Sequence, residues 1–353
     1  MRGAFYKPQD SGPFYSVAKL SPLRISKNCA GVTFDALEGS QLEQMGISIH
    51  QVVGLTTQGA GQDMVVLRVA DHRRSSLDLL DYAAESLTGR NEKLYLPPLL
   101  FQEILAAQLW YAPVFSVEQL QEQFAPQLRA LLLPALVFGS YPEVVTRADK
   151  VEVLANLAAD YLFKDVLQLG LVKTPGLIRK LLQLLAYQVG AEVSVSELAL
   201  TLGIARATVD RYLELLEQTF VIFRLPAFST NPRKEIAKSH KVFFWDTGIR
   251  NALLNDFSLN PLRADIGRLW ENWVVAEVAK QNLLRGRRQE LYFWRSRAGS
   301  EVDLVIKEGE VLHALECKWS ERKAASRAFS EHYGVQVEVV TSAKPLVTLL
   351  PEC

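Results

Sequence analysis

Two stretches near the C-terminal end alternate between polar and apolar residues, and this pattern constrains the fold more than any other feature of the chain. Residues 301–306 read Glu-Val-Asp-Leu-Val-Ile, and residues 311–319 read Val-Leu-His-Ala-Leu-Glu-Cys-Lys-Trp. Successive side chains of a strand point to opposite faces, so each stretch predicts a strand with one apolar face. Glu308-Gly309 predicts a turn that pairs the two strands as a hairpin.

Pairing through that turn brings Asp303 close to Glu316, and alternation places Lys318 on the same face as Glu316. Carboxylate oxygens are hard ligands that Mg²⁺ prefers. We therefore expect Asp303 and Glu316 to bind Mg²⁺, with the Cys317 carbonyl as a third ligand. Lys318 would orient an attacking water or help to deprotonate it. Glu271, on a preceding helix, would complete the site as a fourth catalytic residue of a phosphodiesterase.

A second interpretation of the hairpin stays open, because a solvated, salt-bridged strand face satisfies the same pattern. The order helix Glu, strand, Asp, strand, Glu-x-Lys favours the catalytic interpretation. Cys317 and Trp319 are expected to pack, because Cys317 has no His partner in its own strand to activate the thiol. The surrounding pattern is α/β, with a helix at 269–281 and further strands at 291–295 and 335–341.

The middle of the chain carries helical signals. A helix is expected at 177–187, and Ser194 and Glu197 form a capping box that opens a second helix. Gly203 makes a turn, and a third helix follows with one apolar stripe. The residues of that stripe are Val209, Tyr212, Leu213, Leu216 and Phe220. Strand-like runs at 221–225 and 241–245 complete the pattern of a winged helix-turn-helix.

Such a module would bind DNA phosphates through basic residues of the third helix and of the loop between the two strands. These are Arg206, Arg211, Arg233, Lys234, Lys238 and Lys241. Asp210, Glu214 and Glu217 on the third helix would repel a phosphate backbone. A non-enzymatic module that binds a protein partner therefore remains the alternative.

The composition of the chain limits the classes of protein to which it can belong. The chain has 353 residues, with 39 basic and 39 acidic side chains, so global charge does not indicate a nucleic-acid coat protein. Two local segments are basic, residues 224–250 and 285–297. No apolar run approaches the roughly 20 residues of a membrane span, and no signal peptide is evident. Three scattered cysteines indicate a reducing, cytoplasmic location.

The first 150 residues are harder to interpret. Residues 64–70, Met-Val-Val-Leu-Arg-Val-Ala, predict a buried strand of a parallel sheet. Residues 81–150 have a helical pattern with breaks at Pro97-Pro98 and at Pro134. Residues 151–170 predict an amphipathic helix.

Several segments together resemble the bacterial and archaeal AAA-type P-loop ATPases that carry a C-terminal domain of unknown function, numbered 4143. The resemblance covers about 220 residues in order. Its segments are residues 138–143 (FGSYPE), 184–190 (LLAYQVG), 208–212 (TVDRY), 241–250 (KVFFWDTGIR), 267–274 (GRLWENWV), 292–295 (YFWR), 301–303 (EVD) and 316–319 (ECKW). The resemblance implies an α/β multidomain protein: an ATPase remnant at 1–130, a helical region with the winged helix at 131–260, and a restriction-endonuclease-like fold at 261–353.

The family also implies ATP, but the sequence has no Walker A motif, G-x-x-x-x-G-K-[ST], to hold the phosphates. Val32-Thr-Phe-Asp35 occupies the place of the Walker B strand, with Ala36 where the catalytic glutamate is expected. No nucleotide-binding residue is therefore assigned. A shortened gene and a decayed ATPase domain both account for this. An ATP site completed by another chain, with Arg90 contributing, is a further alternative.

Overall fold

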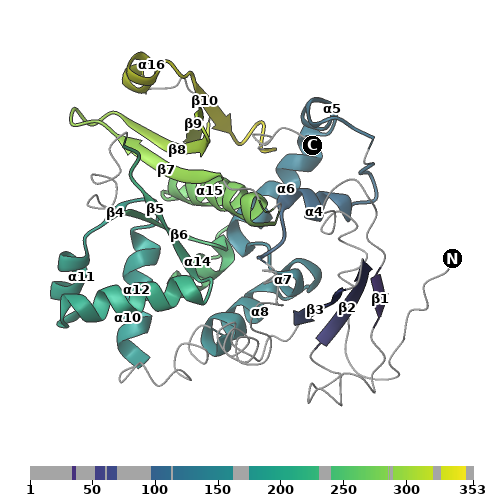
Figure 1. Cartoon of the computed structure of the whole chain (residues 1–353), viewed down its shortest axis with the longest axis horizontal. Coiled ribbons are helices and arrows are strands. Elements are labelled where there is room, and N and C mark those ends of the chain that lie inside the picture. The colour runs from purple at the N-terminus through teal and green to yellow at the C-terminus, as the bar shows by residue number, and fades with distance from the viewer. Residues whose placement is uncertain are drawn as a thin grey trace.

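The computed structural model describes three stretches of the chain and the backbone of three earlier strands (Figure 1). The stretches are residues 97–161 without 113, 175–229, and 240–346 without 285, 287, 288 and 321–326. These parts form a mixed α/β protein with several sheets.

Three strands near the N-terminus form an antiparallel sheet: β1 (Phe34–Ala36), β2 (Val52–Gly59) and β3 (Gln62–Val69). The strand expected at 64–70 is confirmed as β3, but its expected parallel pairing is wrong. β3 pairs antiparallel with β2, Leu55 opposite Val66. Only two residues separate these strands, and a parallel pair needs a much longer crossover.

The helical segment that follows contains α4 (Phe101–Ala106), α5 (Val117–Gln123), α6 (Ala125–Phe138), α7 (Pro142–Thr146) and α8 (Lys150–Asn156), which continues into the π-helix η1 (Leu157–Tyr161). The expected break at Pro134 is wrong, because α6 runs through it. An internal proline costs a helix about 3 kcal/mol. Burial of Leu128, Leu132 and Leu136 on this helix offsets that cost.

The middle part has the three expected helices, α10 (Pro175–Tyr187), α11 (Val195–Leu202) and α12 (Arg206–Gln218), and the two expected strands, β5 (Ile222–Pro226) and β6 (His240–Phe244). It also contains β4 (Glu192–Val193) and α14 (Thr247–Leu254), which were not expected. Phe220, expected on the apolar stripe of the third helix, lies beyond the end of α12 and has a φ of +56°. The Ser194 side chain accepts a hydrogen bond from the Glu197 amide and caps α11, and Gly203 ends this helix in the left-handed region. The strands form an antiparallel sheet in the order β4-β6-β5.

The C-terminal part is a four-stranded sheet with helices on both faces. It contains α15 (Ile266–Leu284), β7 (Glu290–Arg295), β8 (Glu301–Glu308), β9 (Val311–Lys318), α16 (Arg327–Tyr333) and β10 (Val337–Thr341), with strand order β10-β9-β8-β7. The expected β8–β9 hairpin is confirmed, with Leu304 opposite Leu315. β10 runs parallel to β9, and α16 lies in the crossover between them.

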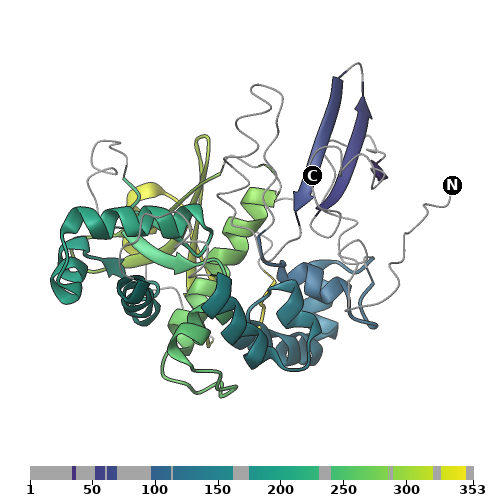
Figure 2. The same cartoon turned by 90° about the horizontal axis from the view of Figure 1, so that it is seen from below.

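Helix α15 lies at the centre of the molecule in both views, with α10–α12 on one side and α4–α6 on the other (Figure 1, Figure 2). Its apolar side packs on the sheet face that carries Leu304, Ile306 and Leu315. Phe329 of α16 packs with Val305 and Ala314 instead. In the described parts of the chain, no helix is both long and apolar enough to cross a membrane.

Direct contacts join the middle and C-terminal parts. Ala227 and Phe293 form a parallel bridge that links β5 to β7. The Asn272 side-chain amide accepts a hydrogen bond from the Phe244 N–H and donates one to the Phe244 carbonyl, both at 2.8 Å. Asn272 is fully buried, so this contact replaces water at the end of β6. The two parts therefore share one interior.

Candidate active site at the β8–β9 hairpin

An open pocket of about 430 Å³ lies against the β8–β9 hairpin. Its lining consists of Ala298, Gly299, Ser300, Glu301, Asp303, Glu316 and Lys318. The structure thus gathers Asp303, Glu316 and Lys318 around one cavity, where the pairing expected from the sequence places them. Their chemical roles depend on the local geometry.

The two carboxylates of the hairpin are held by neighbouring donors. The Asp303 Oδ2 atom accepts a hydrogen bond from the Cys317 N–H at 2.7 Å. The Lys318 Nζ atom lies 2.6 Å from Glu316 Oε1, and the side chain of Glu316 is only 4% exposed while that of Lys318 is 30% exposed. Glu316 is therefore fixed at the floor of the pocket, and Lys318 reaches the solvent.

Burial and neighbouring charges change the acidity of these groups. Burial raises the pKa of Asp303, although the Lys241 ammonium and the Cys317 N–H oppose that shift. Burial by itself would lower the pKa of Lys318, but the hydrogen bond to Glu316 and the charge of Asp303 outweigh it and raise that pKa. Lys318 therefore favours the ammonium form, which suits orientation of a water better than removal of its proton.

Lys241 does not lie on a DNA-facing surface, which corrects the expectation that it binds phosphate. Its side chain is 3% exposed, and its Nζ lies 2.7 Å from Glu271 Oε1, 2.5 Å from Glu301 Oε1 and 4.0 Å from Asp303 Oδ1. Burial alone would lower the pKa of Lys241, but the three carboxylates outweigh burial and raise it. Its position in the buried sheet, between β4 and β5, keeps it from solvent.

Glu271 and Glu301 complete this acidic cluster. Glu271, from α15, bonds to Lys241 and is not among the residues that line the pocket. Burial, with a further contribution from Asp303, raises the pKa of Glu271 to about 8, against the opposing effect of Lys241. Glu301 was not assigned a role from the sequence. Its position two residues before Asp303, on the same strand face, was the signal that could have found it.

The other expected DNA contacts divide into two groups. Arg206 and Arg211 are exposed on α12, and the Arg206 guanidinium lies 4.0 Å from Asp210. Arg233, Lys234 and Lys238 lie outside the described residues.

Two further side chains counted in the charge pattern of the middle part are engaged within the protein. Glu217 pairs with the Arg224 guanidinium at 2.5 Å, so it is not simply a repulsive charge on α12. Arg250 is buried and bonds to the Ala186 carbonyl and to Asp265, so it is no part of a basic surface.

The donor set of the pocket fits a weakly enclosed magnesium ion rather than a closed metal cage. Among the residues with described side chains, no three His, Cys, Asp or Glu groups converge as a metal cage. Asp303 and Glu316 nevertheless line the same open cavity. Magnesium usually binds proteins through one or two carboxylates and keeps waters or substrate phosphates as its other ligands. The cavity leaves room for those ligands.

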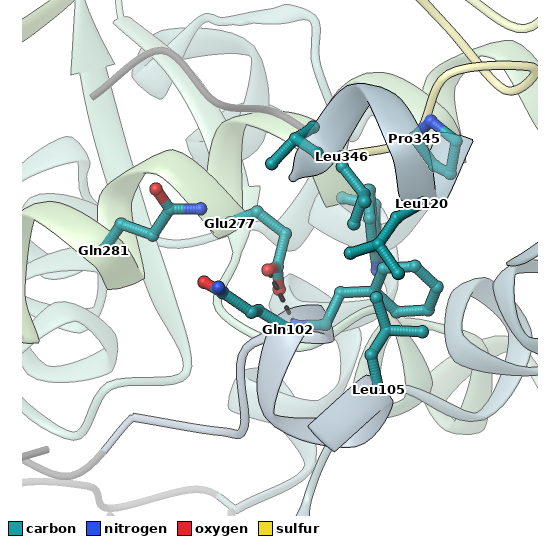
Figure 3. Close-up of a pocket in the computed structure, with 10 residues that line it drawn as sticks. Gln102, Leu105, Leu120, Glu277, Gln281, Pro345 and Leu346 are labelled. Carbon is teal, nitrogen blue, oxygen red and sulfur yellow. Dashed lines mark hydrogen bonds between the residues drawn. The ribbon is translucent and has the colours of Figure 1, made fainter. Parts of the chain in front are cut away.

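A second, smaller pocket of about 40 Å³ lies between α4, α5 and α15 (Figure 3). Its walls are mainly apolar, formed by residues such as Leu105, Leu120 and Trp273. At its edge the Glu277 Oε2 atom accepts a hydrogen bond from the Phe101 N–H at 2.9 Å, and Glu277 pairs with Lys280. These contacts attach the start of α4 to α15, and the volume is too small for a substrate.

Comparison with known proteins gives family matches without an assigned activity. Residues 129–260 match a domain of unknown function (DUF8612), and residues 266–348 match another (DUF4143). The DUF4143 domain expected at the C-terminus is thus confirmed, but the middle part matches a separate family. No solved structure matches the chain.

Three relatives are uncharacterised proteins. Those of Mycobacterium bovis and Mycobacterium tuberculosis are each 26% identical over 327 residues, covering 86% of this chain and 68% of the relative. One from Haemophilus influenzae is 24% identical over 205 residues, covering 56% of this chain and 47% of its own length. The relatives therefore add no chemistry to the site.

Proposed function

We propose that this chain is a DNA-associated protein whose C-terminal part is a magnesium-dependent, nuclease-like phosphodiesterase. The observation that carries the proposal is the gathering of Asp303, Glu316 and Lys318, from two paired strands, around one open pocket. Two carboxylates that can hold a metal ion and an ammonium group that can orient water suit metal-assisted cleavage of a phosphodiester. The sheet order and the flanking helices suit the restriction-endonuclease-like fold implied by the family resemblance.

Each side chain has a role that its position supports. Asp303 and Glu316 would hold the Mg²⁺ ion, which supplies Lewis-acid polarisation of a phosphate oxygen and an activated water. The Cys317 N–H fixes one oxygen of Asp303 and leaves the other for the metal. Lys318, exposed at the pocket and paired with Glu316, would orient the attacking water and balance charge on the phosphate. Glu271 acts behind this site, through Lys241, and so is a positioning residue rather than a catalytic one.

The middle part would supply the contact to DNA. Its helices α10, α11 and α12 and its sheet β4-β6-β5 follow the order of a winged helix-turn-helix. Arg206 and Arg211 stand exposed on α12 and are available for phosphates. The proposal includes no step that uses ATP, because the sequence contains no Walker A motif.

Cleavage of supercoiled plasmid and of a short duplex in Mg²⁺ or Mn²⁺ tests this function. The wild-type protein should cut, and Asp303→Asn and Lys318→Ala should each lower the rate at least about a hundredfold, because the first weakens the metal-binding carboxylate pair and the second removes the ammonium that balances charge on the phosphate. Glu310→Gln is the matched control, since this carboxylate is exposed at the turn of the same hairpin. Equal cutting by the wild type and Asp303→Asn would exclude the assigned site.

A protein-binding module without catalysis is the second candidate, and the mixed charge of α12 favours it. Glu214 is exposed on this helix, and Asp210 lies beside Arg206. Gel retardation of the same duplex without metal separates the candidates. DNA binding predicts that Arg206→Ala with Arg211→Ala weakens retardation and lowers the salt slope by about 2. Absent retardation, together with absent cleavage, would favour the protein partner.

A further inference from the structure

Lys241 comes from β6 of the middle part, yet its charged partners belong to the C-terminal part. Its Nζ lies 2.5 Å from Glu301 of β8, 2.7 Å from Glu271 of α15 and 4.0 Å from Asp303 of β8. The ammonium also lies 5.5 Å from the centre of the Phe293 ring of β7. One lysine thus reaches across the boundary between the two family matches into the candidate active site.

Three carboxylates, Glu271, Glu301 and Asp303, surround the Lys241 ammonium, and Asp303 also lines the open pocket together with Glu316. Buried carboxylates need a cation or a proton. A cation that three carboxylates surround occupies the kind of position that a divalent ion takes in a carboxylate site. A metal ion at Asp303 and Glu316 would enter from the open pocket, which Glu301, Asp303 and Glu316 line, whereas Lys241 is 3% exposed and does not line that pocket.

We propose that Lys241 is an internal cation that holds, among Glu271, Glu301 and Asp303, the place of a second divalent ion, so that the site takes one metal ion rather than two. The inference rests on the proposed metal site at Asp303 and Glu316. Lys241 is then a positioning residue, because it fixes the carboxylates without touching the substrate. The middle part thereby sets the metal content of the C-terminal part.

Counting bound Mn²⁺ by calorimetry and by its electron paramagnetic resonance signal tests this inference on the full chain. The wild type should bind one Mn²⁺ per chain, and Asp303→Asn should lose it. Lys241→Ala, which removes the ammonium and leaves space, should bind a second Mn²⁺, and adding Glu271→Gln should abolish that second ion. Lys241→Arg keeps the positive charge, so this variant should bind one Mn²⁺ per chain. A merely structural lysine would weaken metal binding on removal, not add an ion.

The outcomes separate the inference from the proposed function. One Mn²⁺ in both the wild type and Lys241→Ala, with equal affinity, overturns the inference and leaves the metal site intact. No Mn²⁺ in the wild type, but one in Lys241→Ala that Glu271→Gln removes, supports the role of Lys241 and overturns the metal site of the wild type. No Mn²⁺ in either protein overturns both.

Lys241→Ala takes the ammonium away from the buried Glu271 carboxylate, so Lys241→Gln serves if the alanine variant does not fold. Glutamine keeps most of the volume and can hydrogen-bond to Glu271 and Glu301, but it carries no charge. We then expect the single Mn²⁺ to bind at least tenfold more tightly than in the wild type, because a positive charge beside Asp303 is gone. Unchanged or weaker binding overturns the inference.

Discussion

At the scale of single residues, Gly190 controls how closely the middle part approaches the site. Its φ is +74°, and a Cβ atom placed on it would lie 3.1 Å from the Glu271 Oε2 atom. Its N–H also donates to the Val242 carbonyl, one residue after Lys241. Glycine is therefore needed here for both its conformation and its lack of a side chain.

Gly190→Ala should lower the free energy of unfolding by about 2–3 kcal/mol, since a left-handed alanine costs about 1–2 kcal/mol and Glu271 must shift as well. Gly203→Ala is the matched control, because Gly203 has a φ of +66° and nothing within 4 Å of the added Cβ. Gly203→Ala should lower the free energy of unfolding only by the cost of a left-handed alanine, about 1–2 kcal/mol. Urea unfolding measures both variants, and equal losses would contradict the role of Glu271.

At the scale of elements, α14 depends on a buried cap. The Asp246 Oδ1 atom accepts from the Ile249 N–H at 3.1 Å, and Oδ2 accepts from the Ser140 N–H at 2.7 Å. One side chain thus starts α14 and holds the end of α6 against it. Burial raises the pKa of Asp246, although the Ser140 N–H and Lys280 oppose the shift.

Because the folded protein holds the Asp246 proton more tightly than the unfolded chain, this group stabilises the fold most at low pH. Its contribution falls as the pH rises from the ordinary value of 3.8 through the raised pKa. The free energy of unfolding of the wild type, minus that of Asp246→Asn, should therefore decrease as the pH rises above the ordinary value of 3.8. Urea unfolding of both proteins at several pH values measures this difference. A difference that grows with pH would contradict a raised pKa for Asp246.

Asp149→Asn provides the control for that series. Asp149 caps α8 from an exposed position, and asparagine keeps the accepted hydrogen bond. We expect a change below about 0.5 kcal/mol across the range, since Asn and Asp are equivalent caps.

At the scale of the whole molecule, the middle and C-terminal parts should unfold together. They share the Asn272 contact to Phe244, the Lys241 cluster and the bridge between Ala227 and Phe293. Separating buried polar contacts of this kind costs free energy, because each partner would lose its hydrogen bond without becoming fully hydrated.

Asn272→Ala should lower the stability of both parts equally, by about 2–4 kcal/mol, because it leaves the N–H and the carbonyl of Phe244 unpaired. Hydrogen exchange of the β6 and β9 amides measures this. Loss of protection in β6 alone would contradict a shared interior. Glu192→Gln is the control, since the Glu192–Arg295 bridge is half exposed and should contribute below about 1 kcal/mol.

The sequence by itself determined the features that depend on neighbouring residues. The hairpin that pairs Leu304 with Leu315, the cap at Ser194 and the left-handed Gly203 are all local, so alternation and capping chemistry predicted them. The antiparallel pairing of β2 and β3 was also local, because a two-residue connection excludes a parallel pair, but the apolar run concealed it.

Only the tertiary structure decided the surroundings of the site. Lys241 reads as one more basic residue in a basic segment, and nothing in its neighbours shows that it meets Glu271 and Glu301, 30 and 60 positions away. Charge patterns predict a solvated surface unless packing removes the water. Here α15 and strands β7 and β8 pack against the sheet of the middle part. Lys241 is buried by that packing and is therefore not part of a basic surface.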